Sequence, residues 1–178
     1  MTSIVRFDNL STVAGTGTIT VDAGNTLDTS AGLVTPAGHV IQVVEGVKTS
    51  ISGTTSTSLV ATGITASITP TSSTSKILVA VYLNGVYVSG STTAALFELY
   101  RNGSSIAYLN DITAYHAASG ANHGESTAIS FLDSPSATSE LTYEIYARSS
   151  NGNQLYINNY YSGANRTRST ITLMEIAG

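Results

Sequence analysis

From residue 39 onward, apolar and polar side chains alternate with a period of two, in runs long enough to form strands. This period places successive side chains on opposite faces of a pleated strand. Lys76–Val88 is the most apolar run, although its Asn84-Gly85 pair predicts a tight turn or a bulge. The other predicted strands are 39–47, one within 56–69, 95–101, 104–109, 125–132, 140–148, 154–160 and 169–176.

About nine short strands, with no convincing helix among them, predict an all-β fold. We expect an antiparallel β-sandwich or jelly-roll head. Asn102-Gly103 separates two of these strands and predicts the clearest hairpin in the chain. Composition agrees, because only 10% of the residues are charged and the usual helix formers are scarce.

Residues 1–37 have a different pattern, in which short apolar stretches are interrupted by glycines and Pro36. Such a segment cannot bury a core alone, since three or more strands are needed for independent stability. We therefore expect an extended N-terminal β arm or stalk over 1–37 and a head over 38–178. The apolar residues expected to dock the arm onto a partner are Ile4, Val5, Phe7, Ile19, Val21 and Leu27.

Some strands are apolar on both faces, which bears on assembly. In the run that begins at Lys76, the odd-numbered residues from Ile77 to Leu83 point one way and the even-numbered residues the other. One face can pack the core, and in a helix-free sandwich the available cover for the other is a further copy of the chain. The predicted homo-oligomer contacts are Leu78, Ala80, Tyr82, Met174 and Ile176.

Charge and composition argue against several partners and cofactors. The net charge is −4 and seven Lys and Arg residues form no cluster, so nucleic acid is not an expected partner. No run of 18 apolar residues and no signal-peptide pattern is present, so we expect no membrane insertion. His116 and His123, with Asp111 or Glu125, do not match the spacing of a metal site. We expect no cofactor and no metal.

Catalysis is not expected either. Glu98 and Glu144 are acids that a glycosidase could use, but in strands they more simply face solvent or pair with Arg101 and Arg148. The chain has no G-x-S-x-G motif and no phosphate-binding loop. The sequence therefore favours a protein that is not an enzyme.

An aromatic and amide-rich segment near the C-terminus is the candidate binding patch. Tyrosine combines apolar area with a polar tip, which suits both subunit interfaces and stacking on sugars. Both uses stay open, with the interface or general surface favoured over a glycan site. The patch consists of Tyr156, Asn158, Asn159, Tyr160, Tyr161 and Asn165.

Three stretches of the chain resemble the short fibre and appendage proteins of tailed bacteriophages of aquatic bacteria. The first is GTITVDAGNTLDTS at 17–30 and the second is STSKILV at 73–79. The third comprises SFLDSP at 130–135 with the ending STITLMEIAG at 169–178. The likeness lies in style and motif rather than in a long identical block.

This resemblance implies a homotrimeric virion protein that anchors to the particle through its N-terminal arm. It also implies a head like those of tumour necrosis factor and complement C1q, exposed on the virion for attachment to a host cell-surface polysaccharide. Such a protein is made in the host cytoplasm and released by lysis. The alternatives are a tail fibre, a capsid fibre, a capsid decoration that stabilises the head, or a secreted bacterial lectin or adhesin domain.

Overall fold

The computed structural model describes residues 36–89, 93–113, 124–159 and 167–178. Residues 35–178 belong to one compact unit. The regular elements within the described ranges are all strands: β1 (Val40–Lys48), β2 (Ser52–Thr54), β3 (Val60–Ile68), β4 (Lys76–Val88), β5 (Ala95–Arg101), β6 (Ser104–Thr113), β7 (Gly124–Asp133), β8 (Leu141–Ser149), β9 (Leu155–Ile157) and β10 (Ser169–Ile176). The predicted all-β class is confirmed.

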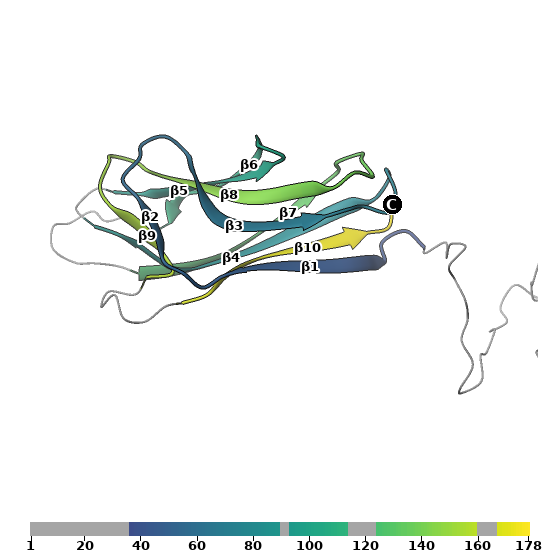
Figure 1. The fold of residues 1–178 in the computed structure, drawn as a ribbon, viewed down its shortest axis with the longest axis horizontal. Coiled ribbons are helices and arrows are strands. Elements are labelled where there is room, and N and C mark those ends of the chain that lie inside the picture. Colours follow the sequence, from purple (N-terminus) through teal and green to yellow (C-terminus); the bar gives the residue numbers. More distant parts are fainter. Residues whose placement is uncertain (1–35, 90–92, 114–123, 160–166) are drawn as a thin grey trace, which may run out of the picture. The chain divides into compact units, whose positions relative to one another are not determined.

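The strands form two antiparallel sheets that pack face to face (Figure 1). Sheet A has the main order β1-β10-β4-β7, and the short strand β9 pairs with the C-terminal end of β4 and with β2. Sheet B has the order β3-β8-β5-β6. The chain passes repeatedly from one sheet to the other, so that sequence neighbours such as β3 and β4 lie in different sheets. This topology is a jelly roll.

The strand boundaries follow the alternation of the sequence closely. The predicted bounds of β4, β5 and β10 agree with the structure, and the hairpin between β5 and β6 turns at Asn102 and Gly103, both with positive φ. Asn102 fixes this turn further, because its side-chain Oδ1 accepts a hydrogen bond from the backbone N–H of Thr142 at 2.8 Å. The predicted hairpin is confirmed.

The structure decides one alternative that the sequence left open and adds one short strand. Asn84-Gly85 is a bulge within β4 and not a turn, since pairing with β7 shifts register between Leu83 and Val86 while the strand continues. Gly85, with φ of +57°, takes the left-handed conformation there. The three-residue strand β2 was not predicted, because Ser52–Thr54 has no alternation to detect.

The core lies between the sheets and is built from the inward residues of each strand. From β4 these are the odd-numbered residues Ile77 to Leu83, and all four are at most 3% exposed. Phe97, Tyr143 and Ile145 face them from sheet B and are fully buried. The predicted separation of β4 into a buried face and an outer face is confirmed.

One edge of the sandwich is closed by the approach of β1 to β3. A Cβ atom on Gly46 would lie 1.9 Å from the backbone oxygen of Thr65 and 3.1 Å from Cγ2 of Ile171. Only glycine allows the two sheets to come this close. At this point the backbones of β1 and β3 are in close contact, with no room for a side chain at residue 46.

No helix in the described part of the chain is long and apolar enough to cross a membrane. The predicted arm residues Ile4, Val5, Phe7, Ile19, Val21 and Leu27 lie outside the described residues, so the division into an arm over 1–37 and a head over 38–178 stays a prediction.

Candidate assembly surface

The outer face of sheet A carries side chains in rows that run across four strands. Val43 on β1 is opposite Met174 on β10, Met174 is opposite Leu78 on β4, and Leu78 is opposite Leu132 on β7. Directly opposed side chains on one face of a sheet lie close enough to pack. These four residues form one continuous apolar row.

Two further rows run parallel to this one. The nearest contains Glu45, Thr172, Ala80 and Ser130, and the one beyond it contains Val47, Thr170, Tyr82 and Ala128. Apart from Glu45 at the β1 edge, the middle row has small side chains and lies between two rows with bulkier ones. Its low profile forms a groove of about 380 Å³, lined chiefly by Ala80, Tyr82, Ala128, Ser130, Thr170 and Thr172.

Large apolar side chains on this face are unusually open to solvent in the single chain. Val43 is 57% exposed, Leu132 51%, Val47 48% and Tyr82 43%. Leu78, Met174 and Ile176 are half-buried. Four of the five predicted contact residues, Leu78, Ala80, Tyr82 and Met174, thus lie in the three rows, and Ile176 follows Met174 on the same face of β10.

The three rows are nearly free of charge. Glu45, at the β1 edge, is their one ionisable carboxylate, and its Oε2 atom accepts a hydrogen bond from Nη2 of Arg168 at 3.2 Å. Four strands about 4.8 Å apart and about eight residues long make a rectangle of about 500 Å², before side-chain relief is added. Each partner in a standard protein interface contributes about 800 Å². The face is therefore of the right order for a subunit contact.

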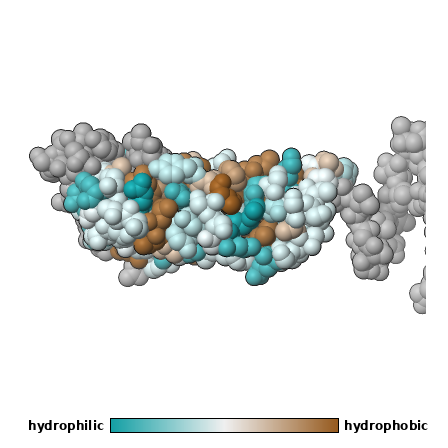
Figure 2. Space-filling view, turned by 90° about the horizontal axis from the view of Figure 1, so that it is seen from above, coloured by the Kyte–Doolittle hydropathy of each residue, from teal (hydrophilic) through white to brown (hydrophobic). Residues whose placement is uncertain are grey.

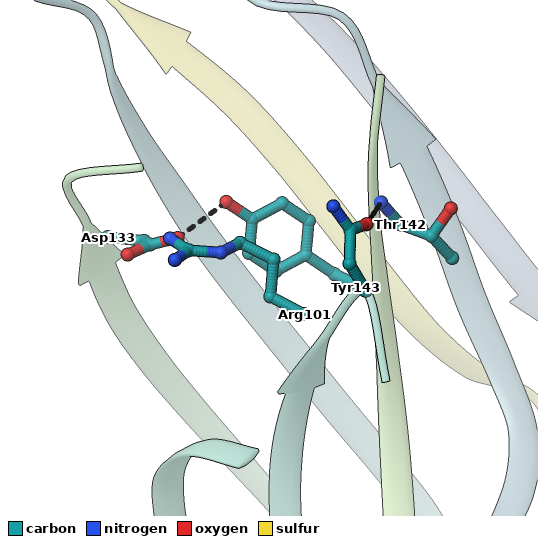
Figure 3. Close-up of polar contacts among 5 residues, drawn as sticks. Arg101, Asp133, Thr142 and Tyr143 are labelled. Carbon is teal, nitrogen blue, oxygen red and sulfur yellow. Dashed lines mark hydrogen bonds and ion pairs between the residues drawn. The ribbon is translucent and has the colours of Figure 1, made fainter. Parts of the chain in front are cut away.

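A buried polar cluster fixes β7 against sheet B (Figure 3). Asp133, at the end of β7, accepts hydrogen bonds at Oδ2 from Nη1 of Arg101 at 2.5 Å and from the hydroxyl of Tyr143 at 2.7 Å. Burial and the hydrogen bond to Asp133 raise the pKa of Tyr143 well above its ordinary value. The cluster joins β5, β7 and β8, so it holds Leu132 in place at the outer edge of sheet A.

A second buried carboxylate ties β10 to its surroundings. Glu175 is fully buried; its Oε2 atom accepts from Nε2 of Gln42 at 2.6 Å, and its Oε1 atom accepts from the backbone N–H and the hydroxyl of Thr71, both at 2.7 Å. Burial alone would raise the pKa of Glu175, but these hydrogen bonds outweigh burial and lower it. The carboxylate therefore stays ionised inside the head.

Alternation assigns Glu175 to the inward face of β10, but it does not predict how a carboxylate there could be buried in ionised form. Its inward position is readable from its neighbours Leu173 and Ala177, which are also buried. The hydrogen-bond donors come from Gln42 and Thr71, which are more than 100 residues away in sequence. Spacing along the chain could not have identified them.

The aromatic and amide-rich segment is divided by the structure. Tyr156 on β9 is half-buried and stacks on Tyr87, with ring centroids 5.9 Å apart. Asn158 is fully buried, and its amide donates to the backbone oxygens of Lys48 and Ser50 while its Oδ1 accepts from Ser169. The side chain of Asn158 is thus occupied by internal bonds and does not line a surface patch.

The rest of that segment is not brought together by the described structure. Asn159 is half-buried next to the bulge, where its backbone N–H donates to the oxygen of Gly85 at 3.1 Å. Tyr160, Tyr161 and Asn165 lie outside the described residues. The patch as a whole stays a prediction.

Of the two alternatives expected for the strand acids, the structure favours the outer face of sheet B over pairing with Arg101. Arg101 binds Asp133 and not Glu98, whose carboxylate instead accepts from the hydroxyl of Ser105 at 2.7 Å. Glu144 has no hydrogen-bond or ion-pair partner among the described residues. The reason is that Arg101 ends β5 next to the buried end of β7, whereas Glu98 lies on the outer face of sheet B.

No cluster of three or more potential metal ligands occurs among the residues that the structure describes. His116 and His123 lie outside those residues, and His39 is exposed just before β1.

Comparison with known proteins gives a distant likeness of fold. No family model and no curated protein sequence matches the chain. Among solved structures, the chain is similar to the crystal structure of the infectious bursal disease virus VP2 subviral particle, with 11% sequence identity and a TM-score of 0.40. The match covers 90% of this chain and 42% of that chain. The chain thus spans less than half of that protein, and a likeness this distant says nothing about partners or activity.

Proposed function

We propose that the chain is a structural protein of a virion, a homotrimeric fibre or appendage that is exposed on the particle. In this proposal, residues 1–37 dock onto other virion proteins and the jelly-roll head is displayed for attachment to a host-surface glycan. The head carries the binding site, and assembly through sheet A brings three copies of that site together. Three weak sites gain affinity from effective concentration without any new contact.

The observation that carries the proposal is the nearly uncharged outer face of sheet A, on which Val43 and Leu132 are more than half exposed. Large apolar side chains gathered on one nearly uncharged face of a soluble protein often mark an interaction site. A further copy of the chain is the partner that is always present at matching concentration, and closed rings are the usual outcome of self-association. The virion assignment and the number of three come from the sequence resemblance.

Charge substitutions on the exposed rows test this assembly. The double variant Val43→Glu with Leu132→Glu adds two carboxylates that would be desolvated in a subunit contact but are hydrated in the single chain. We expect the full-length variant to fold and to have the native mass of a monomer. Tyr108→Glu is the matched control, since Tyr108 is 54% exposed on sheet B. If the double variant keeps the mass of the unchanged protein, the proposed surface is wrong.

A further inference from the structure

The outer face of sheet B differs chemically from that of sheet A. Strands β8, β5 and β6 carry an alternating set of tyrosines and glutamates: Tyr146 on β8 is opposite Glu98 on β5, and Glu98 is opposite Tyr108 on β6. In the adjacent row, Glu144 on β8 is opposite Tyr100 on β5. We call these five residues the tyrosine–glutamate face.

The aromatic rings of this face form a platform. The rings of Tyr100 and Tyr146 are stacked, with centroids 3.9 Å apart and an interplanar angle of 21°. Both rings are half-buried, so each is held in place by its neighbour and by the sheet. Tyr108, one strand further, is 54% exposed. Rings fixed on strands lose little conformational entropy when a ligand stacks on them.

Polar groups with unused hydrogen-bonding capacity surround these rings. Neither Glu144 nor the hydroxyls of Tyr100, Tyr108 and Tyr146 have a hydrogen-bond partner among the described residues. Glu98 accepts one bond, from Ser105 to its Oε2 atom. An ionised carboxylate has about four acceptor sites, so both glutamates keep acceptors free for hydroxyl donors.

We infer that the tyrosine–glutamate face binds a neutral glycan. A sugar ring offers an apolar C–H face that can stack on a tyrosine ring and, around its rim, hydroxyl donors that suit carboxylate acceptors. Among the described side chains on the outer face of β5, β6 and β8, the one guanidinium is that of Arg148, which is half-buried two residues from Tyr146 on β8. This excess of negative charge disfavours glycans that carry uronate, sulfate or phosphate groups. The inference deepens the proposed function by naming the ligand class and the face that binds it.

The location fits assembly through sheet A. The two faces lie on opposite sides of the sandwich, so a contact that covers sheet A leaves sheet B open. Figure 2 looks onto the side of sheet B, where brown apolar areas are separated by pale and teal ones. A surface of this mixed kind is suited to a wet, hydroxyl-rich ligand.

Binding of the full-length protein to immobilised polysaccharides tests the inference. One set of polysaccharides is neutral, and the other carries uronate or sulfate groups. We expect retention on at least one neutral polysaccharide and none on the anionic set. Retention on the anionic set only, or on no polysaccharide, would overturn the inference, and the second result would leave a protein receptor as the alternative for the host contact.

Point variants locate the site on a neutral polysaccharide that binds. Tyr108→Ala and Glu144→Gln change groups without internal partners, so both should fold, and each should weaken binding by about tenfold or more, as expected for a lost stacking or charge-assisted contact. Glu140→Gln is the matched control, since Glu140 is exposed outside the face. Tyr156→Ala tests the rival C-terminal patch. Weakening by Tyr156→Ala with no effect of Tyr108→Ala and Glu144→Gln would overturn the assignment.

Measuring the native mass of each variant distinguishes a failure of the glycan site from a failure of the proposed trimer. Loss of binding in Tyr108→Ala at an unchanged native mass supports a glycan site on sheet B. A monomeric protein that still binds the neutral polysaccharide through these residues would support the site and contradict the trimer.

Discussion

At the scale of single residues, the head is held by a few polar groups buried between apolar strands. Asp133 and Glu175 are both buried, and each accepts hydrogen bonds from donors on other parts of the chain. Removing one donor from such a group leaves an acceptor without its partner, which costs more than an average hydrogen bond contributes. These residues should therefore be sensitive to conservative substitutions.

Tyr143→Phe removes one hydroxyl and leaves the ring in the core. We expect the free energy of unfolding to fall by about 1.5 to 3 kcal/mol, the range for a hydrogen bond to a charged group. Urea denaturation measures this change, and Tyr108→Phe is the control because the hydroxyl of Tyr108 is exposed. Equal stability of the two variants would show that the Asp133 contact is unimportant.

The lowered pKa of Glu175 predicts how the free energy of unfolding depends on pH. Its pKa is lowered in the folded state, so on acidification the unfolded chain takes up the proton first. The stabilisation is then complete above the ordinary pKa of 4.5 and is lost as the pH falls through the lower, folded value.

Urea denaturation at pH 7 and at successively lower pH tests this dependence by comparing the unchanged protein with Glu175→Gln. We expect the variant to be less stable by about 1 to 3 kcal/mol at pH 7. The gap should narrow as the pH falls below 4.5. A gap that is constant with pH would contradict an ionised Glu175 in the folded head.

At the scale of elements, alternation of side chains predicts strands well and their contacts less well. The bounds of β4, β5 and β10 could be read from the sequence because their apolar positions alternate without interruption. Around Gly63 the pattern is harder to follow: Thr62 is buried and Ala61 is exposed, although Ala61 is the more apolar residue. The hydroxyl of Thr62 donates to the backbone oxygen of Ile145, which allows it to be buried.

The candidate surfaces also show that alternation predicts the faces of one strand but not which strands lie side by side. The outer face of β4 could be predicted, since Leu78, Ala80 and Tyr82 alternate with core residues. The tyrosine–glutamate face could not, because its residues come from β5, β6 and β8 and their alignment depends on strand pairing. Register between strands distant in sequence is set by the folded core and is absent from the local pattern.

Gly46 makes the closure between β1 and β3 testable. Gly46→Ala would place a Cβ atom against the backbone of Thr65, which must shift, so we expect a loss of about 2 to 4 kcal/mol of stability, as for strong overpacking. Gly38→Ala is the control: no atom lies within 4 Å of its Cβ position, and it suffers only the left-handed backbone cost of about 1 to 2 kcal/mol. Thermal unfolding should rank the two variants in this order, and the reverse order would contradict the close approach.

At the scale of the whole molecule, the two outer faces of the sandwich have different chemistry. Sheet A carries one wholly apolar row within a nearly uncharged face, and sheet B presents tyrosines and glutamates. A head that assembles through the first and binds through the second needs no catalytic groups. This division of roles is the basis of the proposed appendage.

The native mass of the full-length protein tests this account most directly. We predict a single species at three times 18.4 kDa, measured by native mass spectrometry at micromolar concentration. A stable species at 18.4 kDa, with Val43 and Leu132 open to water, would contradict it.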